Sequence, residues 1–174
     1  MTRRRRNSLR LQEYDYGQAG VYFVTVVLKE RVIMFGEIVN ETVTLNNAGQ
    51  IVQDVWDDLP NHYPNIELDA FIVMPDHVHG IIVIQETESV TNRNVGEIHE
   101  SPLRALHRRR MLLPKMIGRF KTVSAKHVNL LHDRSGQPLW QRGFYDRIIR
   151  DDEELNAVRS YVQANPQRWA EKVI

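Results

Sequence analysis

The alternation of apolar and polar residues divides most of the chain into short segments with the periods of strands and helices. Five runs rich in β-branched and aromatic residues predict strands. They are Val21–Leu28, Arg31–Val39, Thr42–Leu45, Ile66–Met74 and His79–Ile84. Asn40-Glu41 separates the second run from the third and predicts a hairpin. Pro75-Asp76 allows a bend between the last two.

Three other segments carry apolar residues at helical spacing. The first runs from a cap at Asn46 or Asn47 to about Leu59, where Pro60 and Pro64 end it. The second opens at Pro114 and runs to about Leu131, and the third is capped by Asp151 or Asp152 and ended by Pro166. The predicted core faces are Ile51, Val55 and Leu59; Ile117, Phe120, Ser124, Val128 and Leu131; and Leu155, Val158 and Val162.

The order of these elements predicts an α+β fold, with a ferredoxin-like antiparallel sheet and helices packed on one of its faces. We expect a basic N-terminal arm at residues 1–19 and a single domain at residues 20–174. Within that domain, residues 85–113 are polar and irregular and predict an exposed loop. Leu139–Arg150 predicts an extended segment or strand.

Composition narrows the function classes. The 174 residues are 42% hydrophobic and 26% charged, which is ordinary for a soluble globular protein. There is no cysteine, which excludes disulfides, thiolate zinc sites and a cysteine nucleophile. No apolar run is long enough to span a bilayer, and the N-terminal residues lack the apolar stretch of a signal peptide. We therefore expect a cytoplasmic protein without a membrane partner.

Charge is segregated along the chain, although the net charge is only +1. Such clusters of basic residues are what a surface for the phosphate backbone of nucleic acid needs, whereas the alternative is a basic tail and a solvated helix face. The predicted DNA-binding residues are Arg3, Arg4, Arg5, Arg6, Lys115, Arg119, Lys121, Lys126 and Arg142. Arg104, Arg108, Arg109 and Arg110 belong to the same basic stretch.

The most informative motif is the pair His77-x-His79, which is flanked by apolar residues that favour a strand. Side chains two residues apart in a strand point to the same face, so both imidazoles would project together and Val78 would turn into the core. Two imidazoles on one face can bind one metal ion. Histidines that only pack in the core or lie at the surface are the alternative, and the motif itself holds no third ligand.

Tyr161 and Asn165, four residues apart near Pro166, would share a face of the last helix. They are either an interfacial tyrosine and a helix cap or part of a site. As a site, His77, His79 and the Asn165 side-chain oxygen would bind a divalent ion, Mg²⁺ or Mn²⁺. Such an ion would stabilise charge on a phosphate, and the Tyr161 oxygen would attack phosphorus. The chain has no phosphate-binding loop of the GxxxxGK[ST] type.

Three blocks of sequence resemble one known family. They are Met74-Pro-Asp-His-Val-His-Gly80, Trp140-Gln-Arg-Gly-Phe-Tyr-Asp-Arg-Ile-Ile-Arg150 and Tyr161-Val-Gln-Ala-Asn-Pro166. Their residues, order and spacing resemble the single-tyrosine HUH transposases, and most closely the REP-associated tyrosine transposases of bacteria. The resemblance extends over about Gly20 to Trp169, nearly the whole chain.

This resemblance implies a ferredoxin-like domain that cuts and rejoins single-stranded DNA, often beside a hairpin. It implies that Tyr161 is the nucleophile, leaving a 5′-phosphotyrosine and a free 3′-hydroxyl. It also implies that His77 and His79 bind the metal and that Asn165 matches the third ligand, where other branches of the superfamily carry Gln. Asp76 stands where many relatives carry Asn. The resemblance leaves open whether the protein acts as a monomer or a homodimer.

Other assignments remain as alternatives. Tyr145 is a rival nucleophile, but we expect it to pack or to position DNA because no ligand is predicted on its face. Unpaired bases could stack on Trp140, Phe144 or Trp169, with core packing favoured for Trp140. At the level of function, the alternatives are a non-catalytic protein that binds DNA hairpins and a metal-dependent phosphodiesterase that uses water.

Overall fold

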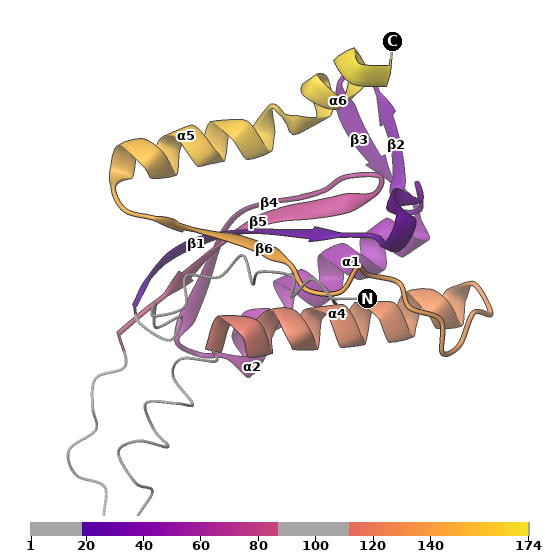
Figure 1. The fold of residues 1–174 in the computed structure, drawn as a ribbon, viewed down its shortest axis with the longest axis horizontal. Helices are drawn as coiled ribbons and strands as arrows, with labels where there is room; N and C mark the ends of the chain where they lie inside the picture. The colour runs from indigo at the N-terminus through magenta and orange to yellow at the C-terminus, as the bar shows by residue number, and fades with distance from the viewer. Residues whose placement is uncertain (1–18, 87–111, 174) are drawn as a thin grey trace, which may run out of the picture.

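A four-stranded antiparallel sheet forms the centre of the fold in this computed structural model, which describes residues 19–86 and 112–173 (Figure 1). The strands lie in the order β4-β5-β1-β6. Their bounds are β1 Gly20–Val27, β4 Ile66–Val73, β5 His77–Ile84 and β6 Tyr145–Ile149. The α+β class and the antiparallel sheet are confirmed. The predicted arm at 1–19 and the loop at 85–113 lie almost wholly outside the described residues.

Helices cover both faces of this sheet, so the prediction that they lie on one face is wrong (Figure 1). On one side lie α1 (Asn47–Asp57), the short α2 (Leu59–His62) and α4 (Leu112–Leu131). On the other side lie α5 (Asp152–Gln163) and α6 (Asn165–Val173). The reason is that β5 carries buried apolar residues on both faces, such as Ile82 on one and Ile81 on the other, and α5 has an apolar stripe of its own to bury. Among the described residues, no helix is long and apolar enough to cross a bilayer.

We call the face of the sheet that packs against α1 and α4 the core face. Alternate residues of β1 and β5, including Tyr22, Val24 and Val78, are fully buried there. Trp56 of α1 stacks on Phe71 with ring centroids 4.3 Å apart. Gly80 lies directly above this indole, and a Cβ atom at position 80 would lie only 2.4 Å from Trp56 Cζ2. The glycine is therefore required for the close approach of Trp56 to the strand.

We call the opposite side the histidine face, because β5 directs His77 and His79 to it. Its apolar cluster is much smaller and consists of Ile81, Ile149, Val158 and Val162, with half-buried neighbours such as Phe23 and Ile72. Val158 and Val162 confirm the predicted core face of α5. On α4, by contrast, Leu131 is 44% exposed and does not extend the predicted apolar face.

A two-stranded hairpin, β2 (Gly36–Val39) and β3 (Thr42–Leu45), packs against α6. Asn40 and Glu41 form its turn with φ angles of 49° and 60°, as in the tight turns that favour β-hairpins. The predicted turn is confirmed, although the first strand begins at Gly36. Asn46 caps α1 as predicted, because its side-chain oxygen accepts a hydrogen bond of 3.0 Å from the Gly49 amide.

The predicted bounds differ from the structure at three further places. β5 begins at His77, two residues before the prediction. The predicted extended segment at 139–150 is a regular strand only at β6, with an isolated bridge between Leu28 and Trp140. Pro166 does not end the helical region, because it is the second residue of α6. A proline is tolerated in the first turn of a helix, where its missing N–H would have no helical partner.

Candidate active site

The two histidines stand at the start of β5, just after a tight turn through Pro75 and Asp76. The Met74 amide donates a 2.8 Å hydrogen bond to the carbonyl of His77 and closes this turn. Both imidazoles are buried, with His77 7% and His79 5% exposed, while Val78 points into the core face. The strand therefore presents the histidines side by side, as its alternation predicted.

Each imidazole is held at its Nδ1 atom by a neighbouring oxygen. Thr25 Oγ1 lies 2.8 Å from His79 Nδ1, and the Asp76 carboxylate accepts from His77 Nδ1. Arg31 in turn donates to Asp76 over 3.3 Å. Burial, and then repulsion from His77, lower the pKa of His79 to about 3, so this ring is neutral at neutral pH. Held in this way, the rings turn their Nε2 atoms toward each other.

The spacing of these two Nε2 atoms fits a shared metal ion. They lie 3.0 Å apart. Two nitrogen ligands about 2.1 Å from one ion and at right angles to each other would be about 3.0 Å apart. Hydrogen bonds that fix the Nδ1 side of ligating histidines are typical of metal sites. Among the described residues, no three His, Cys, Asp or Glu side chains gather to hold an ion.

Tyr161 of α5 lies beside His79 of this pair. Its ring lies 5.4 Å from that of His79, centroid to centroid, at 67°. The ring also meets Phe23 edge-on at 6.0 Å and lies 5.2 Å from the guanidinium carbon of Arg168. Tyr161 is 37% exposed, so it stands at the surface beside the buried imidazoles. The structure therefore brings Tyr161 next to His79.

Asn165, the predicted third ligand, begins α6 and is 7% exposed. Trp169 lies one helical turn later, and its ring is 5.7 Å from that of His77. Residues four apart share a face of a helix, so Asn165 and Trp169 belong to the face of α6 that turns toward the histidines. The placement is consistent with an amide oxygen at the site, while the role of Asn165 as a ligand stays a prediction.

An ion pair fixes the helix that carries Tyr161. Arg159 donates through Nε to one oxygen of Asp69, over 2.9 Å, and through Nη2 to the other, over 2.6 Å. The contact lowers the pKa of Asp69 and raises that of Arg159. It ties α5 to β4 two residues before Tyr161. The sequence analysis missed this pair, because the two residues are 90 positions apart and no local pattern links them.

The rival tyrosine, Tyr145, lies on the same face as His79, so the prediction that no candidate ligand shares its face is wrong. Thr25 of β1 pairs with His79 of β5 on one side and with Tyr145 of β6 on the other. Directly opposite residues of antiparallel strands point to the same face. The order of the strands, which the sequence does not reveal, produces this neighbourhood.

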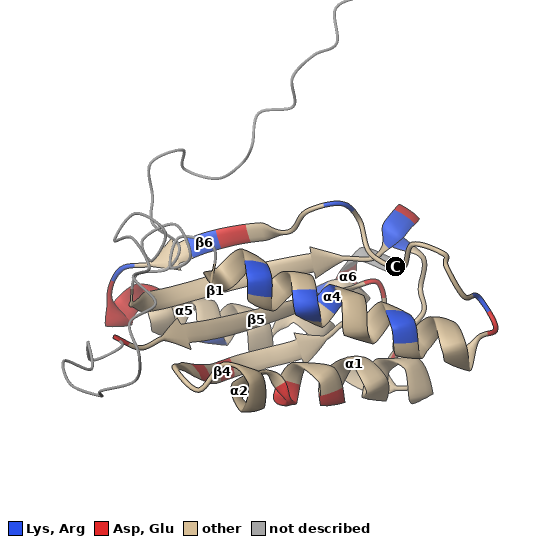
Figure 2. Cartoon of the chain, turned by 90° about the horizontal axis from the view of Figure 1, so that it is seen from below, with Lys and Arg blue, Asp and Glu red and all other residues tan. Residues whose placement is uncertain are grey.

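The predicted DNA-binding residues of α4 lie on the core-face side, away from the histidines (Figure 2). Lys115 and Lys126 are exposed. Lys121 donates to the carbonyls of Gln141 and Gly143 over 2.6 and 2.7 Å, and burial lowers its pKa. Arg119 contacts His62 of α2 at 2.5 Å. Two of the predicted phosphate contacts are thus engaged within the protein.

The other residues that were predicted to contact DNA also include both exposed and buried side chains. Arg142 is exposed, and Arg3, Arg4, Arg5 and Arg6 lie outside the described residues. Trp140 is 7% exposed, as favoured in the sequence analysis, and its indole N–H donates to Ser124 over 3.0 Å. Phe144 packs against the main core. Trp169 is half-buried against His77. Neither Trp140 nor Phe144 is free to stack on a base.

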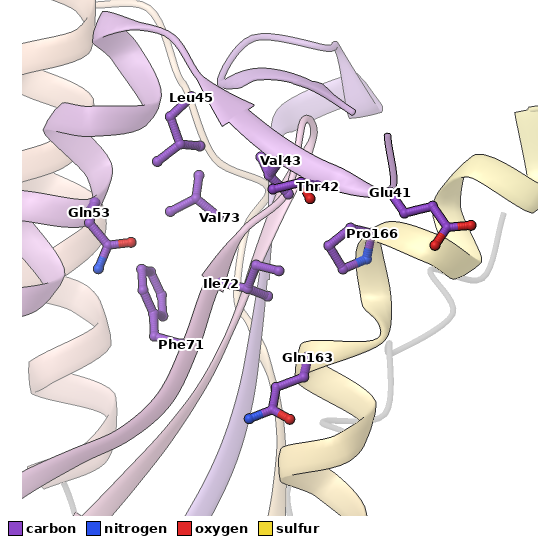
Figure 3. Close-up of a pocket in the computed structure, with 10 residues that line it drawn as sticks. All are labelled: Glu41, Thr42, Val43, Leu45, Gln53, Phe71, Ile72, Val73, Gln163 and Pro166. Carbon is purple, nitrogen blue, oxygen red and sulfur yellow. The ribbon is translucent and has the colours of Figure 1, made fainter. Parts of the chain in front are cut away.

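A separate pocket of about 380 Å³ opens at the free edge of β4, between α1 and the junction of α5 with α6 (Figure 3). It is lined by Glu41, Thr42, Val43, Leu45, Gln53, Phe71, Ile72, Val73, Gln163 and Pro166. None of the candidate catalytic or metal-binding residues lines it. The candidate site is therefore the surface around Tyr161 and the histidines rather than this pocket.

Comparison with known proteins gives two relatives in sequence. A Haemophilus influenzae protein without a functional name is 33% identical over 172 residues, which cover 94% of this chain and 89% of the relative. A second protein of that organism, provisionally named a REP-associated tyrosine transposase, is 28% identical over 153 residues, covering 87% of this chain and 73% of the relative. No family model matches the chain.

Among solved structures, the fold is similar to that of a REP-associated tyrosine transposase bound to a REP hairpin, with a TM-score of 0.56. The match covers 97% of this chain and 74% of the other, at 18% identity. At that identity the likeness establishes the fold alone. It confirms the ferredoxin-like arrangement expected from the sequence.

Proposed function

We propose that this chain is a REP-associated tyrosine transposase, which cuts and rejoins single-stranded DNA beside a hairpin. The proposal draws on the relative bound to a REP hairpin for the kind of DNA. The observation that carries it is the contact of Tyr161 with His79, whose Nε2 faces that of His77 at 3.0 Å. A phenol beside two converging imidazole nitrogens is suited to attack a phosphate held at the same point.

In the proposed reaction, the Tyr161 oxygen attacks the phosphorus of a DNA phosphodiester. A bond forms between that oxygen and phosphorus, and the bond from phosphorus to the 3′ oxygen breaks. The phenol releases its proton, and the departing 3′ oxygen takes one up. The products are a 5′-phosphotyrosine and a free 3′-hydroxyl. Attack by a 3′-hydroxyl on the phosphotyrosine reverses the exchange, so strands are rejoined without another energy source.

His77, His79 and the side-chain oxygen of Asn165 would hold a divalent ion. When bound, the ion supplies Lewis-acid stabilisation of the charge that develops on the phosphoryl oxygens. The two imidazoles favour Mn²⁺, whereas Mg²⁺ prefers oxygen ligands. Thr25 and Asp76 would orient the imidazoles through their Nδ1 atoms, and Asp76 would not itself bind the ion. Burial keeps His79 neutral, as a metal ligand must be.

The test is to trap the covalent intermediate. The purified chain is incubated with a labelled single-stranded oligonucleotide that carries a REP-type hairpin, with and without Mn²⁺, and separated on a denaturing gel. We expect a labelled protein band that requires the ion and is absent in Tyr161→Phe. We also expect Tyr161→Phe to bind the oligonucleotide nearly as tightly as the parent, because the substitution removes only the attacking oxygen.

The other outcomes separate the remaining functions. An adduct in Tyr161→Phe that disappears in Tyr145→Phe would move the nucleophile to Tyr145. Cleavage without any adduct, surviving in Tyr161→Phe, would indicate a phosphodiesterase that uses water. Tight hairpin binding without cleavage under any divalent ion would indicate a protein that only binds DNA.

A further inference from the structure

We propose that Tyr145 is a stacking platform for an unpaired base of the DNA strand held at the candidate site. The inference rests on the proposed function, since it presupposes a single strand crossing the histidine face. It assigns to Tyr145 a binding role with a stated ligand chemistry, the flat face of a nucleobase. Three features of the structure support it. Tyr145 is aligned with His79 across the sheet, its side chain is exposed, and α5 does not cover this part of the face.

Tyr145 is aligned with the site across the sheet. Ile72 pairs with His79, His79 with Thr25, and Thr25 with Tyr145, so these four residues form one row across β4, β5, β1 and β6. Adjacent strands are about 4.8 Å apart, which puts Tyr145 about 10 Å from His79 along the row. A short stretch of single strand leaving a phosphate at the histidines would pass over Thr25 and reach this ring.

The cover of the histidine face ends before Tyr145. On β6 the side chains of Ile149, Arg147 and Tyr145 share this face, because they alternate along the strand. Ile149 is packed against α5 and is 6% exposed. Arg147 forms an ion pair with Glu154 of the same helix. Tyr145, the next in the series, is 52% exposed. The end of β6 at Ile149 is therefore covered by α5, whereas the end at Tyr145 is open.

The chemistry of Tyr145 suits a base. Within the described part of the chain, its side chain has no hydrogen bond, ion pair or aromatic contact that would explain its position. An exposed aromatic ring at the edge of a nucleic-acid site offers a π-face on which any base can stack. Tyr161 contacts His79 and fits the nucleophile, whereas Tyr145 is two strands away.

The experiment measures binding apart from chemistry. In a Tyr161→Phe background, Tyr145 is replaced by Phe, Trp, Leu or Ala, and affinity for the hairpin oligonucleotide with its single-stranded flank is measured by fluorescence anisotropy. We expect Tyr145→Ala and Tyr145→Leu to bind about 5- to 150-fold more weakly, the loss measured for stacked bases elsewhere. Tyr145→Phe and Tyr145→Trp should retain most of the affinity, because they keep an aromatic face. Urea unfolding of each variant verifies the fold.

The control is Leu130→Ala, which removes an apolar side chain, 67% exposed, from the end of α4. It should leave the affinity within about twofold. If Tyr145→Ala and Tyr145→Leu bind as tightly as their parent, the stacking role is wrong, while adduct formation by Tyr161 would keep the proposed function intact. If Tyr145→Phe, made in the otherwise native chain, loses the adduct, Tyr145 acts chemically and the stacking role is overturned. If the native chain bound no DNA, both the stacking role and the proposed function would be wrong.

Discussion

The two faces of the sheet differ in what they bury. The core face holds a continuous set of large apolar side chains from α1, α4, β1, β4 and β5, and the Trp56 ring contacts those of both Phe71 and Phe120. The histidine face buries only a small apolar cluster under α5, and beside it the imidazoles of His77 and His79. One face supplies most of the apolar burial, while the other holds polar groups at fixed distances.

This contrast shows how a single strand can serve both purposes. Residues of β5 alternate between the two faces of the sheet. The apolar side chains on the core face therefore anchor the strand that carries His77 and His79 on the histidine face. Stability and site geometry are thereby separated by side-chain direction rather than by position along the chain. Substitutions on the two faces should therefore have different consequences, and the following experiments compare them.

The largest expected effect on stability is on the core face. Trp56→Ala should lower the free energy of unfolding by about 3–5 kcal/mol, because it leaves a cavity in the centre of the ring cluster. Urea denaturation followed by circular dichroism measures the loss. Tyr161→Phe on the histidine face is the matched control and should change stability by no more than about 0.5 kcal/mol. Similar losses in both variants would contradict the division between the faces.

The second largest expected effect is stabilisation of the fold by a bound metal ion. Mn²⁺ at about 100 times its dissociation constant should raise the free energy of unfolding by about 2.7 kcal/mol, because the ion binds the folded state alone. His77→Gln should abolish most of this gain. His127→Gln, which alters an exposed histidine of α4, should keep it. Thermal unfolding with added Mn²⁺ and with a chelator gives the comparison, and equal gains in both variants would place the ion elsewhere.

The third effect is a pH dependence confined to the histidine face. His79 has a pKa of about 3 when folded but about 6.5 when unfolded, so the unfolded chain binds the proton first as the pH falls. Stability contributed by the neutral ring is present above pH 6.5 and is lost on acidification toward pH 3. Between pH 8 and pH 5 the loss is about 2 kcal/mol. Urea denaturation with a chelator measures it.

The control for this pH dependence is His79→Gln, which keeps a polar side chain without the titrating group. The difference between the two proteins isolates His79 from all other ionisable groups. The variant should lose less stability over the same interval. Parallel curves for the two proteins would show that the imidazole is not kept neutral by burial.

The smallest effect concerns the attachment of α5. Asp69→Asn should lower the free energy of unfolding by about 1 kcal/mol, since the pair with Arg159 is partly exposed. A double-mutant cycle with Arg159→Gln should show that the two substitutions are not additive. Additive losses would mean that the ion pair does not hold the helix. The rate of adduct formation in Asp69→Asn then reports how far this attachment positions Tyr161.

Local features of the site were predictable because they depend on nearby residues. The alternation around Val78 places both histidines on one face, and Asn46 and Asp151 cap their helices as their side-chain chemistry indicates. The four-residue spacing in α5 predicted Val158 and Val162 as its core face. Each of these inferences uses only a period or a side chain within a few positions.

Long-range features could not be predicted in this way. The pairing of β6 with β1 puts Tyr145 in the row of His79, and nothing in the sequence around Tyr145 specifies which strand lies beside it. Lys121 looks like a solvated cation on a basic helix, yet it binds two backbone carbonyls of a segment 20 residues later. Pro166 indicated a helix end, although a new helix begins one residue before it.

The missing side chain at Gly80 has a consequence for how the site could be altered. The indole of Trp56 packs directly against Gly80, the residue that follows His79 in β5. Any larger residue would clash with this indole, so the strand or the indole would have to shift. Such a shift beside His79 would change the distance between the two Nε2 atoms, and it would start from the opposite face of the sheet.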